Sequence, residues 1–178
     1  DGAIDLRGKE IEPLRERQIK EAASQISDKG LSRVAVVGKF CQRNHSHELK
    51  AGEILAAGLP GAHIELGHKV SGQLNFPRRA ATTMLTAATK DKYEKFAADV
   101  ASALAERKIK APVYILKADG GTLPLDRSVG MPVETIFSGP AASIMGVLAL
   151  TEAGQTSVVV DIGGTTTDLA LILSGQPL

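Results

Sequence analysis

The residues with the clearest chemical potential form the stretch DIGGTTTD at positions 161–168. Gly163 and Gly164 lack a Cβ, so backbone N–H groups can approach an anion closely there, and a positive φ costs little. The three threonine hydroxyls that follow add hydrogen-bond donors. A turn of this composition is typical of a phosphate-binding loop.

Asp161 and Asp168 stand at the two ends of this stretch. Two carboxylates would repel a bare phosphate, whereas a magnesium ion or its bound waters between the carboxylates and the phosphates would remove the conflict. The stretch therefore indicates a site for a magnesium-bound nucleotide. A tight Gly-Gly hairpin with solvated aspartates and threonines is the alternative, and the motif alone leaves both interpretations open.

Two strands and one helix must position this turn. Apolar residues at 158–160 and 169–173 predict strands close enough in sequence to form a hairpin. Gly139-Pro140 predicts the start of a helix with proline in its first turn, and Gly154 predicts its end. Because a hairpin is not stable alone, it requires further strands or a packed helix.

Helical and strand patterns alternate along the whole chain, which predicts an α/β fold. The expected elements are a helix after Pro13 that stops at Lys29-Gly30, a strand at 33–37, a helix capped by Asn44 and reaching about Ala57, a strand at 63–66, a long helix at 77–108 interrupted near Lys90-Asp91, and a strand at 113–116.

Composition excludes several classes of protein. The 178 residues are 43% hydrophobic, enough for a core, and the formal net charge of +1 with six aromatic residues argues against nucleic-acid binding. Cys41 has no partner for a disulfide, which fits the cytoplasm. No charged leader precedes an apolar segment and no apolar run could span a bilayer, so we expect no membrane partner.

Five motifs in fixed order give the chain a family resemblance. They are RNHSHE with Asn44, His47 and Glu48; RRAATTML with Arg79, Ala80, Thr82 and Thr83; ADGG at 118–121; Pro132-Val133 followed by SGPA at 138–141; and DIGGTTTD at 161–168. The last resembles the phosphate-binding hairpin of the actin, hexokinase and heat-shock chaperone ATPases. Together the five are similar to the hydantoinase A and 5-oxoprolinase family.

The resemblance implies an incomplete ribonuclease-H-like fold, a mixed sheet flanked by helices. Residues 1–154 would form the later part of a first domain with a helical insertion at about 77–108, and residues 155–178 would open a second ATPase domain. The chain would be an internal fragment with little or no ATP hydrolysis of its own, because an earlier phosphate hairpin and the adenosine-binding elements would lie elsewhere.

The activity that the resemblance implies is ATP-dependent opening of a cyclic amide, a hydantoin or 5-oxoproline, through phosphoryl activation of the amide oxygen. ATP and Mg²⁺ would be the cofactors, and a second enzyme subunit is compatible with this class. The implied roles are magnesium binding through water for Asp161, phosphate binding for Gly163, Gly164 and Thr165, and completion of the catalytic loop by Thr166 and Asp168. An ATP-dependent carboxylase subunit and a partner-driven ATPase or reactivating factor are the alternatives.

Two further segments are candidates for substrate binding. Asp119-Gly120-Gly121 follows a predicted strand, where ligands approach an open α/β sheet, although a plain turn explains the same residues. Ser138 and Gly139 begin a helix whose free N–H groups could hold an anion, but interdomain packing is the favoured interpretation.

The last candidates lie in the first half of the chain. His47 and Glu48 could be metal ligands, yet a helix start with Glu48 in its first turn explains most of that pattern and is favoured. Arg79 could bind a carboxylate or phosphate, but a single arginine on a long helix is more often a salt-bridged surface residue.

Overall fold

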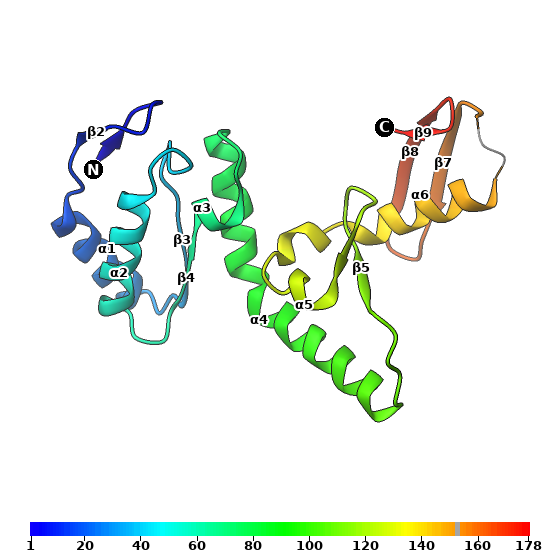
Figure 1. The fold of residues 1–178 in the computed structure, drawn as a ribbon, viewed down its shortest axis with the longest axis horizontal. Helices are drawn as coiled ribbons and strands as arrows, with labels where there is room; N and C mark the ends of the chain where they lie inside the picture. Colours follow the sequence, from blue (N-terminus) through cyan, green and yellow to red (C-terminus); the bar gives the residue numbers. More distant parts are fainter. Residues whose placement is uncertain (152–153) are drawn as a thin grey trace. The chain divides into compact units, whose positions relative to one another are not determined.

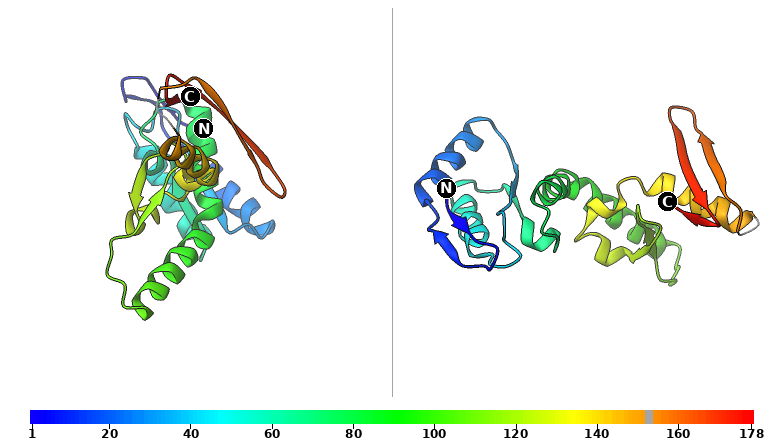
Figure 2. Two further views of the ribbon diagram at one scale, coloured as in Figure 1. Left: turned by 90° about the vertical axis from the view of Figure 1, so that its right-hand side faces the viewer. Right: turned by 90° about the horizontal axis from the view of Figure 1, so that it is seen from above.

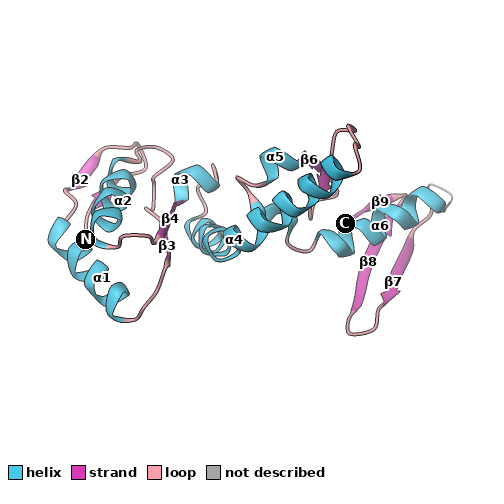
Figure 3. Ribbon diagram, turned by 90° about the horizontal axis from the view of Figure 1, so that it is seen from below, coloured by secondary structure: helices cyan, strands magenta, loops and turns pink. Residues whose placement is uncertain are grey.

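The computed structural model describes residues 1–151 and 154–178. The chain divides into two compact units, Asp1–Lys92 and Tyr93–Leu178, which are described separately. Helix α4 (Phe76–Glu106) runs through the boundary between them. Helices alternate with short strands throughout (Figures 1 and 3), so the predicted α/β class is confirmed. The division into residues 1–154 and 155–178 remains a prediction.

The first unit contains a two-stranded parallel sheet, a short antiparallel pair formed by its first two strands, and helices beside them. Its elements are β1 (Ala3–Ile4), β2 (Glu10–Glu12), α1 (Glu16–Asp28), β3 (Arg33–Val36), α2 (Ser46–Gly58), β4 (His63–Leu66), α3 (Gly67–Val70) and the first part of α4. Strands β3 and β4 pair in parallel, with Arg33 opposite His63 and Val36 opposite Leu66. The strand predicted at 63–66 is therefore confirmed.

The core of the first unit lies between α1 and α2. Ala23 of α1 packs with Leu55 of α2 and with Leu59, and all three are buried. Partly buried apolar residues surround them, namely Ile19, Ile26, Val34, Val36, Ala62 and Ile64. Helix α1 thus packs apolar residues inward, and it ends before Gly30, whose φ is +64°, close to the predicted stop at Lys29-Gly30.

Helix α4 is continuous over 31 residues, so the interruption expected near Lys90-Asp91 is wrong. Asp91 forms an ion pair with Arg33 of β3, which gives this charged segment a tertiary partner in the first unit. In the second half of α4 Ala97 is buried, whereas Phe96 is 47% exposed. No described helix combines the length and the apolarity needed to cross a membrane.

The second unit contains two antiparallel sheets and one long helix besides the end of α4. Its elements are β5 (Tyr114–Leu116), β6 (Thr122–Pro124), α5 (Leu125–Ser128), a 3₁₀ helix at Pro132–Thr135, α6 (Ser138–Leu150), β7 (Ser157–Ile162), β8 (Thr167–Leu173) and β9 (Gln176–Pro177). Both predicted strands of the last hairpin are present, and α6 begins at the predicted position. The chain forms several small sheets rather than the single mixed sheet that was expected.

The turn between β5 and β6 depends on one glycine. Gly120 has a φ of +80°, and a Cβ built there would lie 3.4 Å from Sδ of Met145. We expect Gly120→Ala to lower the free energy of unfolding by about 1–2 kcal/mol, because an L-residue is strained in this region. Gly146→Ala is the control, since Gly146 lies inside α6 with nothing within 4 Å of a built Cβ. Chemical denaturation should show the control to be neutral or stabilising; equal destabilisation by both substitutions would contradict the assignment.

Candidate functional site

The register of β7 and β8 places the two acidic residues of the DIGGTTTD stretch side by side. Asp161 lies directly opposite Asp168, and Ile162 lies opposite Thr167. Directly opposed residues of an antiparallel pair share one face of the sheet. Both carboxylates therefore belong to the same face of the hairpin, at the end of the strands next to the turn.

The glycine turn closes the hairpin by a backbone hydrogen bond from the N–H of Gly163 to the carbonyl of Thr166, at 2.9 Å. Neither Gly163 nor Gly164 has a positive φ, so the conformational reason expected for these glycines is wrong. Lack of space for a side chain explains the glycine at position 163 only. A Cβ on Gly163 would lie 3.2 Å from the carbonyl oxygen of Thr166, and a Cβ on Gly164 would project into open space.

The chemistry of this donor set fits a magnesium-bound phosphate. Like charges directly opposite each other destabilise a strand pair, and a divalent cation near Asp161 and Asp168 would offset that repulsion. Carboxylates are the ligands that bind Mg²⁺ in nucleotide sites, where the metal keeps several waters and contacts phosphate oxygens. The exposed turn at 163–166, with Gly164 open to solvent, leaves room for the phosphates.

The two faces of the hairpin differ sharply. The face of the aspartates also carries Ile172, which is 3% exposed, and α6 contacts β7. The opposite face is an exposed ladder of six aliphatic residues with exposed fractions of 47–78%: Val158, Val160, Ile162, Leu169, Leu171 and Leu173. Figure 2 shows the long, narrow hairpin extending beyond α6. Strand β7 is thus not the fully covered strand that its apolar sequence suggests.

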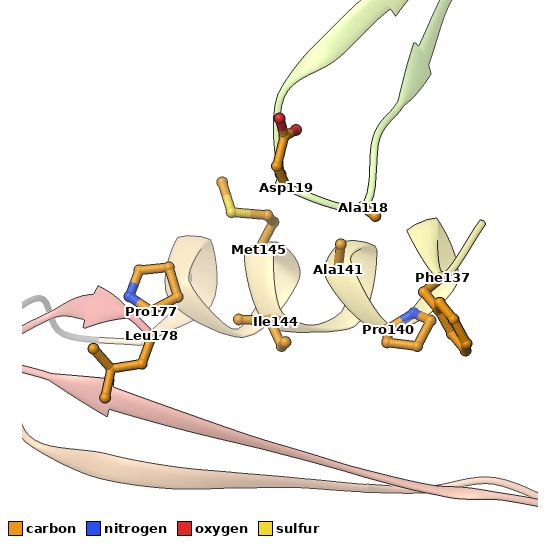
Figure 4. Close-up of a pocket in the computed structure, with 10 residues that line it drawn as sticks. Ala118, Asp119, Phe137, Pro140, Ala141, Ile144, Met145, Pro177 and Leu178 are labelled. Atoms are coloured by element: carbon orange, nitrogen blue, oxygen red, sulfur yellow. The ribbon is translucent and has the colours of Figure 1, made fainter. Parts of the chain in front are cut away.

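The β5–β6 turn and α6 border a cavity of about 350 Å³. Its lining residues are Ala118, Asp119, Gly120, Phe137, Pro140, Ala141, Ile144, Met145, Pro177 and Leu178. In Figure 4 the turn lies on one side of α6 and the hairpin on the other, and the carboxylate of Asp119 is directed away from the helix. The structure therefore brings the predicted Asp119-Gly120 turn to the first half of α6.

An ion-pair network holds the carboxylate of Asp119. Oδ2 lies 2.8 Å from Nζ of Lys117, and Oδ1 accepts the N–H of Gly121 at 2.9 Å. Lys117 also lies 3.3 Å from Oε2 of Glu134. The hydrogen bond from Lys117, with that from Gly121, holds the pKa of Asp119 below its ordinary value, so this carboxylate is ionised at neutral pH.

The start of α6 differs from what the sequence suggested. Phe137 precedes the helix in the left-handed conformation, with φ +65°, and its side chain is 77% exposed. Ser138 and Gly139 form the first helical positions but do not line the cavity. The first turn presents Pro140 to the cavity instead, and proline has no N–H to offer an anion.

His47 and Glu48 do not converge on a shared metal position. Nε2 of His47 lies 2.8 Å from Oε2 of Glu10, whereas Glu48 is buried among other partners. Among the residues that the structure describes, no group of three or more His, Cys, Asp or Glu side chains could hold a metal ion. The metal role remains a prediction without support from this geometry.

Asn44 is not the N-cap of α2, contrary to the expectation. His45 occupies that position without a capping side-chain hydrogen bond. Asn44 lies one residue earlier, where Oδ1 accepts the N–H of Ser46 at 3.0 Å and Nδ2 donates to the carbonyl of Gly8 at 3.0 Å. Its side chain therefore joins the start of α2 to the loop between β1 and β2.

Glu48 joins the ends of the two parallel strands. Oε1 accepts the N–H of Gly38 at 2.7 Å, and Oε2 accepts the N–H of His68 at 2.8 Å and faces Nδ1 of the same histidine at 2.6 Å. Burial would raise the pKa of Glu48, but hydrogen bonds from Cys41, Gly38 and His68 lower it below the ordinary value. Burial, followed by the contact with Glu48, raises the pKa of Cys41 to about 11, so the thiol is protonated at neutral pH.

Arg79 is a structural residue rather than the surface ion-pair partner that was expected. It is fully buried, and its guanidinium donates to the carbonyls of Gly38, Lys39 and Gln73. Arg79 from α4 and Glu48 from α2 therefore bind the same loop. Arg79 donates to carbonyls of this loop, and Glu48 accepts one of its N–H groups. These contacts lie within the first unit.

Sequence reasoning missed Lys117, His68 and Phe137. Lys117 and Asp119 are two residues apart at the start of the β5–β6 turn, and this oppositely charged pair so close in sequence was the available signal for the ion pair. Nothing in the local pattern indicates the contact of His68 with Glu48 or the left-handed conformation of Phe137.

Two family patterns match the chain. The family described as "Hydantoinase/oxoprolinase" matches residues 79–178, and its companion "Hydantoinase/oxoprolinase N-terminal region" matches residues 1–58. The first covers more than half of the described sequence and includes the ADGG, SGPA and DIGGTTTD motifs.

Curated relatives match almost the whole chain but are much longer. The caprolactamase α subunit of Pseudomonas jessenii is 28% identical, with 98% of this chain and 25% of the relative covered. An uncharacterized protein of Methanocaldococcus jannaschii is 25% identical over 98% of this chain and 26% of its own length. The acetone carboxylase β subunit of Xanthobacter autotrophicus is 24% identical, with coverages of 97% and 24%. The chain thus spans about a quarter of the length of these relatives.

Two solved structures likewise match almost the whole of this chain over about a quarter of their own length. The nucleotide-free structure of acetone carboxylase has a TM-score of 0.86 at 23% identity, with 98% of this chain and 25% of that chain covered. The ATP-dependent caprolactamase of Pseudomonas jessenii has a TM-score of 0.70 at 27% identity, with coverages of 96% and 25%. The fold described above is therefore similar to parts of both enzymes.

Proposed function

The chain belongs to the hydantoinase/oxoprolinase family, and on this premise we propose that the full-length protein is an enzyme that uses ATP to open a cyclic amide. Similarity to an enzyme described as ATP-dependent caprolactamase supports the use of ATP and the class of substrate. This chain would contribute one part of the nucleotide site and one wall of the substrate site.

The observation that carries the proposal is the pairing of Asp161 with Asp168 beside an open glycine turn. In the proposed site these carboxylates hold Mg²⁺ directly or through its waters, and Gly163, Gly164, Thr165 and Thr166 face the phosphates. Magnesium bound there would neutralise charge on the phosphate oxygens. We propose further that the fold is of the ribonuclease-H-like ATPase type, with β7 and β8 opening its second domain.

An amide needs such help because it is a poor electrophile. Transfer of the terminal phosphoryl group of ATP to the amide oxygen, with ADP leaving, converts that oxygen into a good leaving group. Water then attacks the carbon, the ring C–N bond breaks as the nitrogen leaves as an amine, and a second water hydrolyses the resulting acyl phosphate to the carboxylate and inorganic phosphate. The protein residues in this proposal bind and orient the reactants and stabilise charge in the phosphoryl-transfer step.

A second candidate activity is ATP-dependent carboxylation of a ketone. It is supported by similarity to the acetone carboxylase β subunit and to the acetophenone carboxylase γ subunit of Aromatoleum aromaticum, each about 24% identical to this chain. The same nucleotide hairpin would then activate a carbonyl compound for carboxylation. Since these relatives and the caprolactamase are named as subunits, we also propose a second subunit, in a cytoplasmic enzyme.

The test is phosphate release from ATP by the full-length protein with a panel of hydantoins, lactams, 5-oxoproline and simple ketones with bicarbonate. We expect turnover to rise at least about tenfold above background with a cyclic amide, because binding energy from the correct substrate assembles the site. Stimulation by a ketone and bicarbonate alone would replace the hydrolase with the carboxylase. Turnover indifferent to every small molecule would indicate a partner-driven ATPase and contradict both.

A further inference from the structure

The cavity between the β5–β6 turn and α6 has the size of a small-molecule site. Its volume of about 350 Å³ lies within the usual range for ligand pockets, about 300–1,000 Å³. All of its lining residues belong to the second unit, which also holds the Asp161–Asp168 pair. Apart from Asp119, the lining side chains are apolar, with Phe137 and Pro140 at one end of α6 and Ile144 and Met145 farther along it (Figure 4).

Among the described residues that line this cavity there is no Lys, Arg or His. Lys117 is engaged by Asp119 and Glu134. The free N–H groups at the start of α6 do not compensate, because Ser138 and Gly139 are not lining residues and Pro140 has no N–H.

A negative group stands at its edge instead. Asp119 lines the cavity through the turn, and its carboxylate is ionised and directed away from α6. A substrate carboxylate brought into the cavity would lose hydration without gaining a cationic partner among the described lining residues. An uncharged apolar ring would not have this cost, and it would gain contact with Ile144 and Met145.

We propose that this cavity binds the ring of an uncharged, largely apolar carbonyl substrate and discriminates against substrates that carry a carboxylate. The inference rests on the proposed function and narrows its substrate class. Within the cyclic amides it favours simple lactams over 5-oxoproline. Phe137 is then a specificity-determining residue that lines the cavity at the start of α6.

The sharpest comparison uses two lactams with the same five-membered ring. 2-Pyrrolidinone and 5-oxoproline differ only in the carboxylate. The ratio of their kcat/KM values for ATP-dependent ring opening by the full-length protein therefore measures the effect of that charge. We expect 2-pyrrolidinone to be favoured at least about tenfold. Equal or reversed preference would overturn the inference while leaving the lactam-opening function intact.

A charge substitution tests the location. Phe137→Lys places a cation at an exposed wall of the cavity and should move the preference toward 5-oxoproline, so that the ratio falls toward one. Met84→Lys is the matched control, because Met84 is 57% exposed on α4 and lies outside the cavity. It should keep the original ratio. An equal shift in both variants would place the discrimination elsewhere and overturn the assignment.

Binding is also measured without turnover. In full-length protein labelled with ¹³C-methyl methionine, the Met145 signal is identified by its loss in Met145→Leu. Titration with 2-pyrrolidinone should shift that signal, and 5-oxoproline at the same concentration should not. A shift without any lactam-stimulated ATP hydrolysis would support the cavity and refute the proposed function. Failure of both ligands to shift it would refute the cavity, whatever the activity.

Discussion

Asp161→Asn in the full-length protein is expected to lower substrate-dependent ATP turnover by at least about 100-fold, the usual cost of removing one group that stabilises charge in the transition state. The substitution keeps the size of the side chain and removes its charge. Asp161 lies directly opposite Asp168, so the variant also removes a repulsive cross-strand pair. The free energy of unfolding should therefore stay unchanged or rise slightly while activity falls.

This combination of results separates a binding role from a structural one. Asp99→Asn is the control, because Asp99 is an exposed residue of α4 that no part of the proposal uses. Phosphate release and urea denaturation on both variants provide the two measurements. Full activity in Asp161→Asn would remove the magnesium-nucleotide assignment, and a large loss of stability would assign Asp161 to the fold instead.

The sequence predicted best what depends on neighbouring residues. The strand at 63–66, the hairpin around the glycine turn and the start of α6 all follow from local periodicity and from the positions of Gly and Pro. The residues that suggest a nucleotide site, two aspartates on either side of two glycines, are likewise close together in the sequence. Their placement on one face follows from the strand register, which the structure supplies.

Contacts between distant segments were outside the reach of such reasoning. The interruption expected at Lys90-Asp91 was based on charge, but α4 continues there, and Asp91 has an ion-pair partner in Arg33. A positive φ was one of two reasons expected for the glycines of the turn, but neither has one, and only at Gly163 would a Cβ meet a close atom, the carbonyl oxygen of Thr166. The burial of Arg79 depends on carbonyls about 40 residues earlier in the chain, at Gly38 and Lys39.

Glu48→Gln should cause the largest loss of stability, about 3–5 kcal/mol in the free energy of unfolding. Glu48 is 2% exposed and accepts hydrogen bonds from Gly38, His68 and Cys41. A glutamine would present an NH₂ group to one set of these donors and leave them unpaired. Glu53→Gln, at an exposed position of the same helix, should change stability by less than about 0.5 kcal/mol in the same denaturation experiment.

The pH dependence distinguishes the loss of this charge from a mere change of shape. The pKa of Glu48 in the folded protein lies below its ordinary value of 4.5. Its ionised form therefore contributes stability that is fully present above the unfolded value and is lost as the pH falls through the folded value. Glu48→Gln has no such group to titrate. The difference in unfolding free energy between the two proteins should thus be constant near neutral pH and shrink as the pH falls below the pKa of Glu48 in the unfolded chain. A difference independent of pH would show that the carboxylate is not the source of the stability.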